Sequence, residues 1–209
     1  MGKLQAKGLT KRYGKLVVLD GLSFEADPGV TVITGRSGSG KSTLLRLLAT
    51  LEKPSAGHIL WDAKEIWTGV RNYRSALGYA PQAIGWPESL TAIEFLVHIA
   101  ALKRIRRADA IIQGGALLTR VGLGGDADRP IRAYSGGMRR RLGLSQALLG
   151  EPQVLLLDEP AAELDSETSY EIHELIFEQA ARGATVLMTT HRQDALGDRE
   201  VSKLVIADR

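Results

Sequence analysis

The chain has 209 residues and a formal net charge of +3 at pH 7, which suits one large α/β domain and gives no reason to expect a nucleic-acid partner. It contains no cysteine, which excludes thiol chemistry, zinc–cysteine sites and disulfides and fits a reducing compartment. No run approaches 18 apolar residues and the N-terminus lacks the apolar core of a signal peptide, so we expect any work at a membrane to be done from the cytosol through a partner.

Residues 1–34 are predicted to form short strands separated by turn-prone Gly, Asp and Pro residues. The first three predicted strands are Leu4–Ala6, Leu16–Leu19 and Leu22–Phe24. Strands so close together in sequence indicate an antiparallel sheet beside the main domain. The apolar run Val30–Ile33 predicts a further strand, which leads into the first motif of the chain.

A complete G-x-x-x-x-G-K-[ST] motif occupies Gly35–Ser42, between that run and a predicted helix from Lys41 to about Leu51. Its glycines let the backbone turn N–H groups toward phosphate oxygens, and the helix adds the positive end of its dipole. Lys41 supplies a positive charge for the β- and γ-phosphates, and the Ser42 hydroxyl is suited to ligate Mg²⁺. A glycine-rich turn with a chance Lys-Ser pair is the alternative, which the flanking strand and helix disfavour. The residues expected to bind the nucleotide here are Gly35, Arg36, Ser37, Gly38, Ser39, Gly40, Lys41, Ser42 and Thr43.

Tyr13 lies upstream of this loop, and two interpretations of it stay open. It suits an ordinary half-buried position in a strand. An aromatic ring at this distance before a phosphate-binding loop also suits stacking on adenine, which contributes ~1–3 kcal/mol per base.

Gln82 follows a predicted strand, Ala76–Ala80, which Pro81 ends. This places Gln82 on a loop at the carboxyl edge of the sheet, where open α/β sheets bind ligands. A single glutamine on a loop is more often only exposed to solvent, so its interpretation depends on the other motifs.

Residues from about Trp86 to Gly150 have a helical pattern, which includes Ala92–Leu102 and Ile111–Val121. The basic run Lys103–Arg107 between them is interpreted as a solvated helix end. We therefore expect a helical subdomain at about 86–150, inserted into a nucleotide-binding core formed by 1–85 and 151–209. Together they make a single domain, 1–209.

The triplet Ser135-Gly136-Gly137 stands near the end of this helical region, directly before another helical stretch. Serine at this position is a common helix cap. A helix N-terminus with glycine amides also binds anions. The pattern alone leaves both interpretations open.

Val154–Leu157 is a continuous apolar run, typical of a central parallel strand that is buried on both faces. It ends in Asp158 and Glu159, two carboxylates that are costly to bury unless a cation or hydrogen bonds hold them. Mg²⁺ bound by Asp158 meets this requirement, and Glu159 is then suited to activate a water for attack on the γ-phosphate. A second core strand, Ala184–Thr190, places His191 at an equivalent strand end.

These motifs, in this order, resemble the nucleotide-binding subunit of an ABC transporter, and the resemblance covers nearly the whole chain. It matches Tyr13 to an adenine-stacking aromatic, Gly35–Ser42 to Walker A, Gln82 to the Q-loop glutamine, Tyr134–Met138 to the family signature, Val154–Glu159 to Walker B with the catalytic glutamate, Asp165 to the D-loop aspartate and His191 to the switch histidine. The resemblance implies an α/β fold: a P-loop NTPase core with a mostly parallel sheet, an N-terminal antiparallel β sheet and an inserted α-helical subdomain.

The same resemblance implies a Mg²⁺-dependent ATP hydrolase. Its catalytic residues are Lys41, Gln82, Glu159 and His191, and its Mg²⁺ ligands are Ser42, Gln82 and Asp158. It implies a head-to-tail dimer on ATP binding, a homodimer or a pair with another ABC subunit, in which Ser135, Gly136 and Gly137 contact the partner's ATP. It also implies a separate integral-membrane permease, at which the chain lies on the inner face of the membrane.

Two positions depart from the common family pattern. The signature continues with Met138, where glutamine is usual, and Tyr134–Arg141 looks like the ABC-2 branch of drug and antibiotic exporters. Glu163 adds a carboxylate to the D-loop, where a small residue is common. A soluble ABC ATPase, such as an assembly factor, remains the alternative function to transport.

Trp86, Leu90 and Phe95 are large apolar residues beside the Gln82 loop. They are suited to form a groove for a cytoplasmic helix of the permease. The alternative is that they form the core of the helical region itself, which suits Phe95 better than Trp86.

Overall fold

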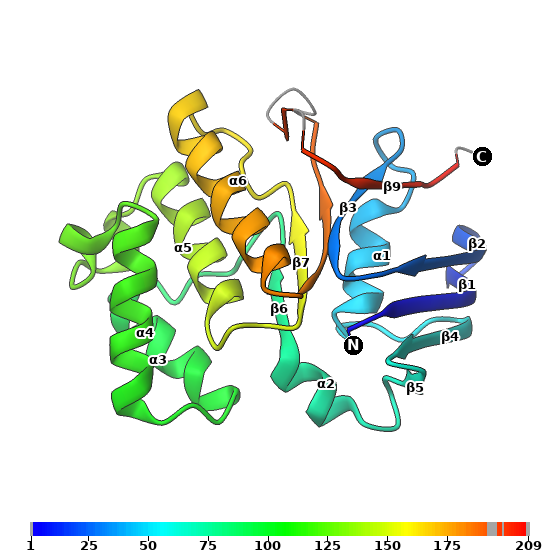
Figure 1. Ribbon diagram of the computed structural model, residues 1–209, viewed down its shortest axis with the longest axis horizontal. Helices are drawn as coiled ribbons and strands as arrows, with labels where there is room; N and C mark the ends of the chain where they lie inside the picture. The colour runs from blue at the N-terminus through cyan, green and yellow to red at the C-terminus, as the bar shows by residue number, and fades with distance from the viewer. Residues whose placement is uncertain (1, 192–195, 198, 208–209) are drawn as a thin grey trace.

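The computed structural model describes residues 2–191, 196–197 and 199–207. Two sheets and a set of helices form its architecture (Figure 1). The strands are β1 (Leu4–Tyr13), β2 (Leu16–Ala26), β3 (Gly29–Thr34), β4 (Ala56–Trp61), β5 (Lys64–Glu65), β6 (Leu77–Ala80), β7 (Val154–Asp158), β8 (Thr185–Thr189) and β9 (Ser202–Val205). The helices are α1 (Lys41–Leu48), α2 (Val70–Ala76), α3 (Ala92–Leu102), α4 (Arg107–Arg120), α5 (Gly136–Leu148) and α6 (Ser166–Ala181), with short 3-10 turns at Gly124–Asp126 and Ile131–Ala133.

The central sheet is parallel and has the strand order β6-β7-β8-β3-β9. All five residues of β7 and all five of β8 are buried, as expected for apolar strands that are covered on both faces. In Figure 1, helices α3–α6 lie on one side of this sheet, and α1 with the second sheet lies on the other. Strand β9, near the C-terminus, pairs with β3 at the edge of this sheet.

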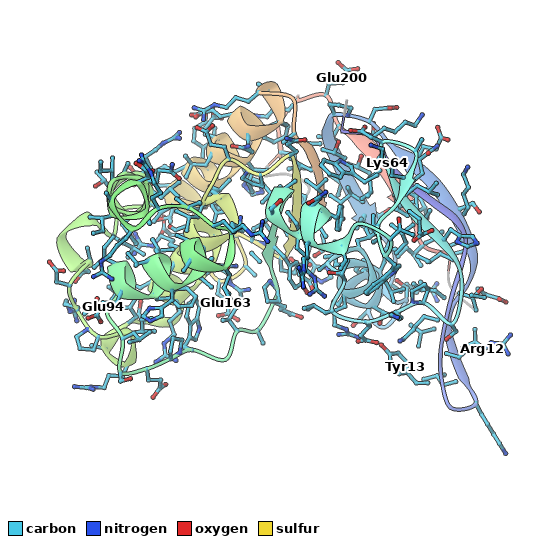
Figure 2. All side chains as sticks on the ribbon, turned by 90° about the horizontal axis from the view of Figure 1, so that it is seen from below. Arg12, Tyr13, Lys64, Glu94, Glu163 and Glu200 are labelled. Carbon is cyan, nitrogen blue, oxygen red and sulfur yellow. The ribbon has the colours of Figure 1, made fainter. Side chains whose placement is uncertain are left out.

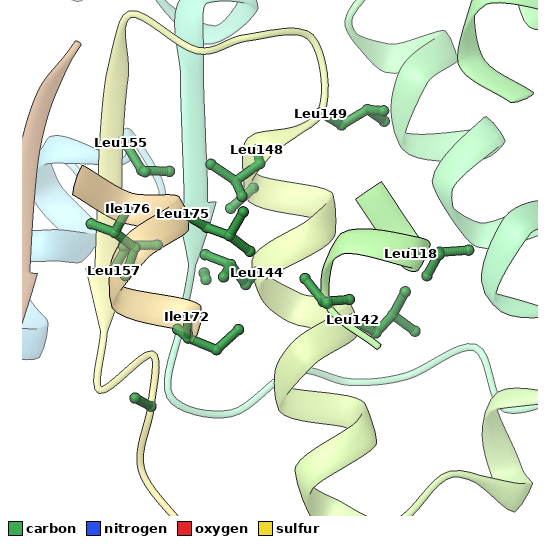
Figure 3. Packing of buried hydrophobic residues seen from close by; sticks show 14 of the residues in the cluster. Leu118, Leu142, Leu144, Leu148, Leu149, Leu155, Leu157, Ile172, Leu175 and Ile176 are labelled. Atoms are coloured by element: carbon green, nitrogen blue, oxygen red, sulfur yellow. The ribbon is translucent and has the colours of Figure 1, made fainter. Parts of the chain in front are cut away.

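Alternate residues of each central strand serve two different cores. On one face, Leu155 and Leu157 of β7 contact apolar side chains of α5 and α6, as Figure 3 shows. On the other face, Val154 and Leu156 pack with α1, whose Leu44, Leu45, Leu47 and Leu48 are fully buried. The same core includes side chains of the antiparallel sheet. Helix α1 is therefore fixed between two sheets, and so is the loop that precedes it.

The second sheet is antiparallel, with the order β2-β1-β4-β5. The α/β fold with a mostly parallel sheet and an N-terminal antiparallel sheet is thus confirmed. The prediction of three short strands before residue 25 is wrong, because the chain forms two long strands there. Gly8 and Gly21 have left-handed backbone angles, φ 59° and 63°, within the strands, where the register shifts. They form bulges rather than the turns that their sequence predicts.

Three further details differ from the expectations. Helix α1 ends at Leu48, three residues early, and α2 falls in a stretch for which no element was predicted. The basic run after α3 is only partly solvated, because Lys103 Nζ donates a hydrogen bond to the Leu149 carbonyl oxygen at 2.7 Å. Burial lowers the pKa of Lys103 to about 8. This contact joins the end of α3 to the end of α5.

Helix α5 lies unusually close to β6. A Cβ atom on Gly78 would stand 2.0 Å from the carbonyl oxygen of Ala147. The Gln146 Nε2 atom donates to the Tyr79 carbonyl oxygen at 2.5 Å, one residue further along β6. The absence of a side chain at Gly78 therefore sets the distance between α5 and the sheet.

We predict that Gly78→Ala lowers the free energy of unfolding by about 3 kcal/mol or more, because the new methyl group collides with backbone. Gly115→Ala in α4 is the matched control, since a Cβ there meets nothing within 4 Å. That change should raise stability by up to about 1 kcal/mol, because alanine favours helix. Urea unfolding of both variants measures the difference. Equal stability of Gly78→Ala and the parent would contradict the close approach.

Candidate functional site

A cavity of about 460 Å³ lies at the carboxyl ends of β3, β7 and β8. Its lining brings together eleven of the predicted site residues, which are Tyr13, Ser37, Gly38, Gly40, Lys41, Ser42, Thr43, Gln82, Asp158, Glu159 and His191. Arg36 and Ser39 line a second hollow, which shares Ser37 and Gly38 with the first. The ends of β3, β7 and β8 thus meet the end of β1, at Tyr13, and the loop that carries Gln82.

The loop between β3 and α1 has the geometry of an anion-binding loop. Gly40 caps α1 with a left-handed φ of 101°, and no side chain caps the helix N-terminus. Lys41 Nζ donates hydrogen bonds to the carbonyl oxygens of Gly35 and Arg36 at 2.8 and 2.7 Å, which holds the ammonium group over the loop. The Ser39 hydroxyl is buried and has no hydrogen-bond partner among the described residues. Amides, a cation and an unused hydroxyl fit a bound phosphate chain.

The register of β7 against β8 sets the acidic part of the site. Asp158 pairs with Thr189 in the parallel ladder. The Thr189 hydroxyl donates to Asp158 Oδ1 at 2.7 Å and accepts from the Glu159 N–H at 2.9 Å. Asp158 is only 4% exposed. A buried carboxylate with a neutral hydroxyl partner is a suitable ligand for Mg²⁺, together with the nearby Ser42 hydroxyl.

Glu159 has a left-handed backbone conformation, with φ 55°. Such a conformation is uncommon outside glycine and is typical of functional sites. It turns the side chain toward His191, whose Nε2 lies 3.3 Å from Glu159 Oε1. The His191 N–H also donates to Glu159 Oε2, at 3.3 Å. The predicted catalytic glutamate and the predicted switch histidine are therefore in direct contact.

Gln82 lies on the loop after β6, and its side chain is exposed at the edge of the cavity. Its backbone carbonyl oxygen accepts a hydrogen bond from the Arg140 guanidinium of α5 at 3.0 Å. Further along this loop, Trp86 is half-buried and packs edge-on against Phe95, with ring centroids 5.4 Å apart. Phe95 itself is buried in the core of the helices, as its alternative interpretation expects.

The triplet Ser135-Gly136-Gly137 begins α5, and the Met138 N–H donates to the Ser135 hydroxyl oxygen at 3.2 Å. The capping interpretation of Ser135 is thus correct for the single chain. Among the described residues, the triplet is not part of the lining of the 460 Å³ cavity. Gly136 instead lines a separate hollow of about 260 Å³, together with Gln82, Asp158 and Glu163.

Asp165 caps α6, since the Thr168 N–H and hydroxyl donate to its two carboxylate oxygens at 2.9 and 2.8 Å. These bonds hold the pKa of Asp165 below its usual value. Glu163, nearby in sequence, has a left-handed φ of 64°. Figure 2 shows Glu163 on the side of the molecule that carries the helices and Tyr13 on the side of the β1–β2 hairpin. The unusual carboxylate of Glu163 is therefore well separated from the predicted adenine position.

Three residues in contact with the site were not predicted, namely Thr189, Arg140 and Glu52. Thr189 joins Asp158 to Glu159, Arg140 holds the Gln82 loop, and Glu52 accepts a hydrogen bond from Tyr13. For Thr189 the sequence offered one indication, a polar residue at the end of an apolar strand. The other two contacts depend on segments that only the fold brings together.

Comparison with known sequences identifies a family. The sequence model described as ABC transporter matches residues 19–162. The chain is 34% identical over 206 residues to the Nod factor export ATP-binding protein I of Ralstonia nicotianae, covering 98% of this chain and 64% of that protein. It is 36% identical over 226 residues to the histidine transport ATP-binding protein HisP of Pseudomonas aeruginosa, covering 99% and 87%. It is 36% identical over 202 residues to the daunorubicin resistance ATP-binding protein DrrA3 of Streptomyces coeruleorubidus, covering 92% and 62%.

The chain thus spans less than two thirds of the length of two of these relatives. Among solved structures, an ATP-binding subunit of an ABC transporter superposes with a TM-score of 0.88 at 27% identity, over 97% of this chain and 85% of that one. A nucleotide-free ATP-binding cassette at 22% identity, with a TM-score of 0.81, supports the fold alone. The chain belongs to the ABC transporter family, as one of its ATP-binding and ATP-hydrolysing domains.

Proposed function

We propose that the chain is the energy-coupling ATPase of a membrane transporter, in which two such domains close head to tail on ATP and drive transport through a separate membrane subunit. The observation behind this proposal is the gathering of the phosphate loop, Asp158-Glu159 and His191 in one cavity, while the triplet Ser135–Gly137 begins a helix outside it. A second copy of the chain, or a paired ABC subunit, would supply that triplet to the nucleotide.

The direction we propose is export. The relatives include proteins named for Nod factor export and daunorubicin resistance, and also a histidine transport protein. The run Tyr134–Arg141 favours the exporting group, because it resembles the ABC-2 branch. Among the described residues no helix is long and apolar enough to cross a membrane. We propose that the chain lies on the inner face of the membrane, bound to its permease through the surface around Gln82 and Trp86.

Each site residue has a role in this proposal. The loop 35–43 holds the phosphates, with Lys41 on the β- and γ-phosphates, and Tyr13 contacts the adenine. Ser42, Asp158 and Gln82 would hold Mg²⁺, which neutralises charge on the phosphate oxygens when bound.

Hydrolysis depends on Glu159, which takes the proton of the attacking water. His191 contacts the Glu159 carboxylate and orients it. Thr189 fixes the backbone of Glu159 and one oxygen of Asp158, so it aligns the base with the metal ligand.

Glu159→Gln should keep ATP binding and lower the steady-state hydrolysis rate, on the order of 10²- to 10⁴-fold, because the amide does not act as a base. Glu171→Gln, at an exposed position of α6, is the control and should match the parent. Lys41→Ala should instead raise the dissociation constant for ATP. Hydrolysis by Glu159→Gln within a few-fold of the parent would remove Glu159 from the mechanism.

Thr189→Val should lower the ATPase rate about tenfold or more, because it removes a hydrogen bond to a buried carboxylate, which contributes ~1.5–3 kcal/mol. Thr189→Ser keeps the hydroxyl and should stay within a few-fold of the parent. Urea unfolding of both variants separates this effect from a loss of fold. A valine variant that is folded and as active as the serine variant would contradict the bridging role.

The Glu159→Gln variant should form a dimer with Mg-ATP, because nucleotide that binds both subunits stabilises their association. Light scattering should then report twice the mass of the chain, and the double variant with Lys41→Ala should remain at the mass of one chain. An unchanged mass of Glu159→Gln at saturating Mg-ATP would count against the head-to-tail dimer of the isolated subunit.

A further inference from the structure

Tyr13 is the last residue of β1 and lies at the edge of the nucleotide cavity, with 41% of its surface exposed. A half-exposed ring at the end of a hairpin strand would ordinarily have considerable freedom. Here its hydroxyl donates to Glu52 Oε2 at 2.5 Å. The Lys11 ammonium lies over the same ring, 4.9 Å from the centroid. Contacts at the hydroxyl and over one face therefore fix the orientation of the ring.

Glu52 is itself held by two cations. Lys11 Nζ lies 2.9 Å from Oε2, and Arg46 Nε lies 2.8 Å from Oε1. Both carboxylate oxygens thus have partners, and one of them is shared by Lys11 and the Tyr13 hydroxyl. The hydrogen bond from Tyr13, followed by the one from Lys11, holds the pKa of Glu52 below its usual value. The carboxylate therefore remains ionised at neutral pH.

Arg46 connects this cluster to the phosphate loop. Its NH2 group donates to the Thr43 hydroxyl oxygen at 3.1 Å, within the first turn of α1. The same group lies 3.4 Å from the Tyr13 hydroxyl. A continuous set of hydrogen bonds thus runs from the helix that follows the phosphate loop to the aromatic ring. This connection fixes the position of the Tyr13 ring relative to the first turn of α1.

We propose that Glu52 is a positioning residue for nucleotide binding, which fixes the Tyr13 ring as a platform for the adenine base and couples that platform to α1 through Arg46. The inference rests on the proposed ATP site. Because Lys11 covers one face of the ring, the base stacks on the other face. The ring is then ordered before the nucleotide binds, so binding does not include the entropic cost of ordering it and the affinity is higher.

A purely structural ion pair is the competing explanation for these contacts, and it makes a different prediction. An exposed salt bridge contributes little to stability, and its loss would not depend on which ligand is present. Loss of a residue that positions an adenine platform should weaken the binding only of ligands that carry a base. Tripolyphosphate has the phosphates of ATP without the base, so comparing the two ligands separates the explanations.

The test measures dissociation constants for Mg-ATP and Mg-tripolyphosphate by titration calorimetry. Glu52→Ala and Tyr13→Phe should weaken ATP binding by about 5- to 20-fold, a part of the full stacking contribution. The affinity for tripolyphosphate should stay within twofold of the parent. In steady-state assays KM for ATP should rise while kcat is retained. Glu52→Gln still accepts the Tyr13 hydrogen bond and should restore most of the ATP affinity.

Glu25→Ala is the matched control, since Glu25 forms an ion pair with Lys3 at 2.5 Å in the same antiparallel sheet. It should bind ATP like the parent. Unchanged ATP affinity in Glu52→Ala would overturn the proposal, and so would an equal loss for ATP and tripolyphosphate. If the parent binds both ligands and Lys41→Ala loses both, the ATP site stands whatever Glu52→Ala shows. A parent that binds neither ligand would overturn the site and this inference together.

Discussion

The parallel pairing of β7 with β8 determines how Asp158, Glu159 and His191 are placed relative to one another. Asp158 lies opposite Thr189. Glu159, the next residue after Asp158, contacts His191, two residues beyond Thr189. A shift of one residue in this register would move alternate side chains from one core to the other. Because both faces of β7 and β8 are buried by apolar side chains, such a shift is strongly disfavoured. By fixing this register, the two hydrophobic cores also fix the positions of Asp158 and Glu159.

Helix α1 contributes the second constraint. It lies between the parallel and antiparallel sheets, and four of its leucines are fully buried. The phosphate loop is therefore attached to the most enclosed helix near the site, while Tyr13 comes from the antiparallel sheet beside it. Two separate elements, joined through Arg46 and Glu52, face one cavity. The proposed nucleotide site thus lies where the two sheets meet and takes residues from both.

The sequence predicts most of this because the motifs are local. A phosphate loop needs only consecutive residues, and Asp158, Gln82 and His191 each follow a recognisable strand. The contacts that join these motifs are different in kind. Asp158 and Thr189 are 31 residues apart, Tyr13 and Glu52 are 39 apart, and Gln82 and Arg140 are 58 apart. Neither periodicity nor motif spacing specifies such pairs, because they depend on register and on the packing of α5. The two long strands were missed for a related reason, since a glycine in a bulge and a glycine in a turn look alike in sequence.

Helix α5 is where the two halves of the proposed dimeric site are connected. Its first residues are the triplet Ser135–Gly137, and its body contacts β6 and the Gln82 loop at successive turns. Arg140 binds the Gln82 carbonyl oxygen, Gln146 binds the Tyr79 carbonyl oxygen, and Ala147 stands against Gly78. Contacts this close leave little room for α5 to slide along β6, because packed interiors do not deform continuously. The Gln82 loop and the N-terminus of α5 are therefore connected through one closely packed helix. In the head-to-tail dimer that we propose, that N-terminus would face the partner's nucleotide, so α5 would link the Gln82 loop of one subunit to the site of the other.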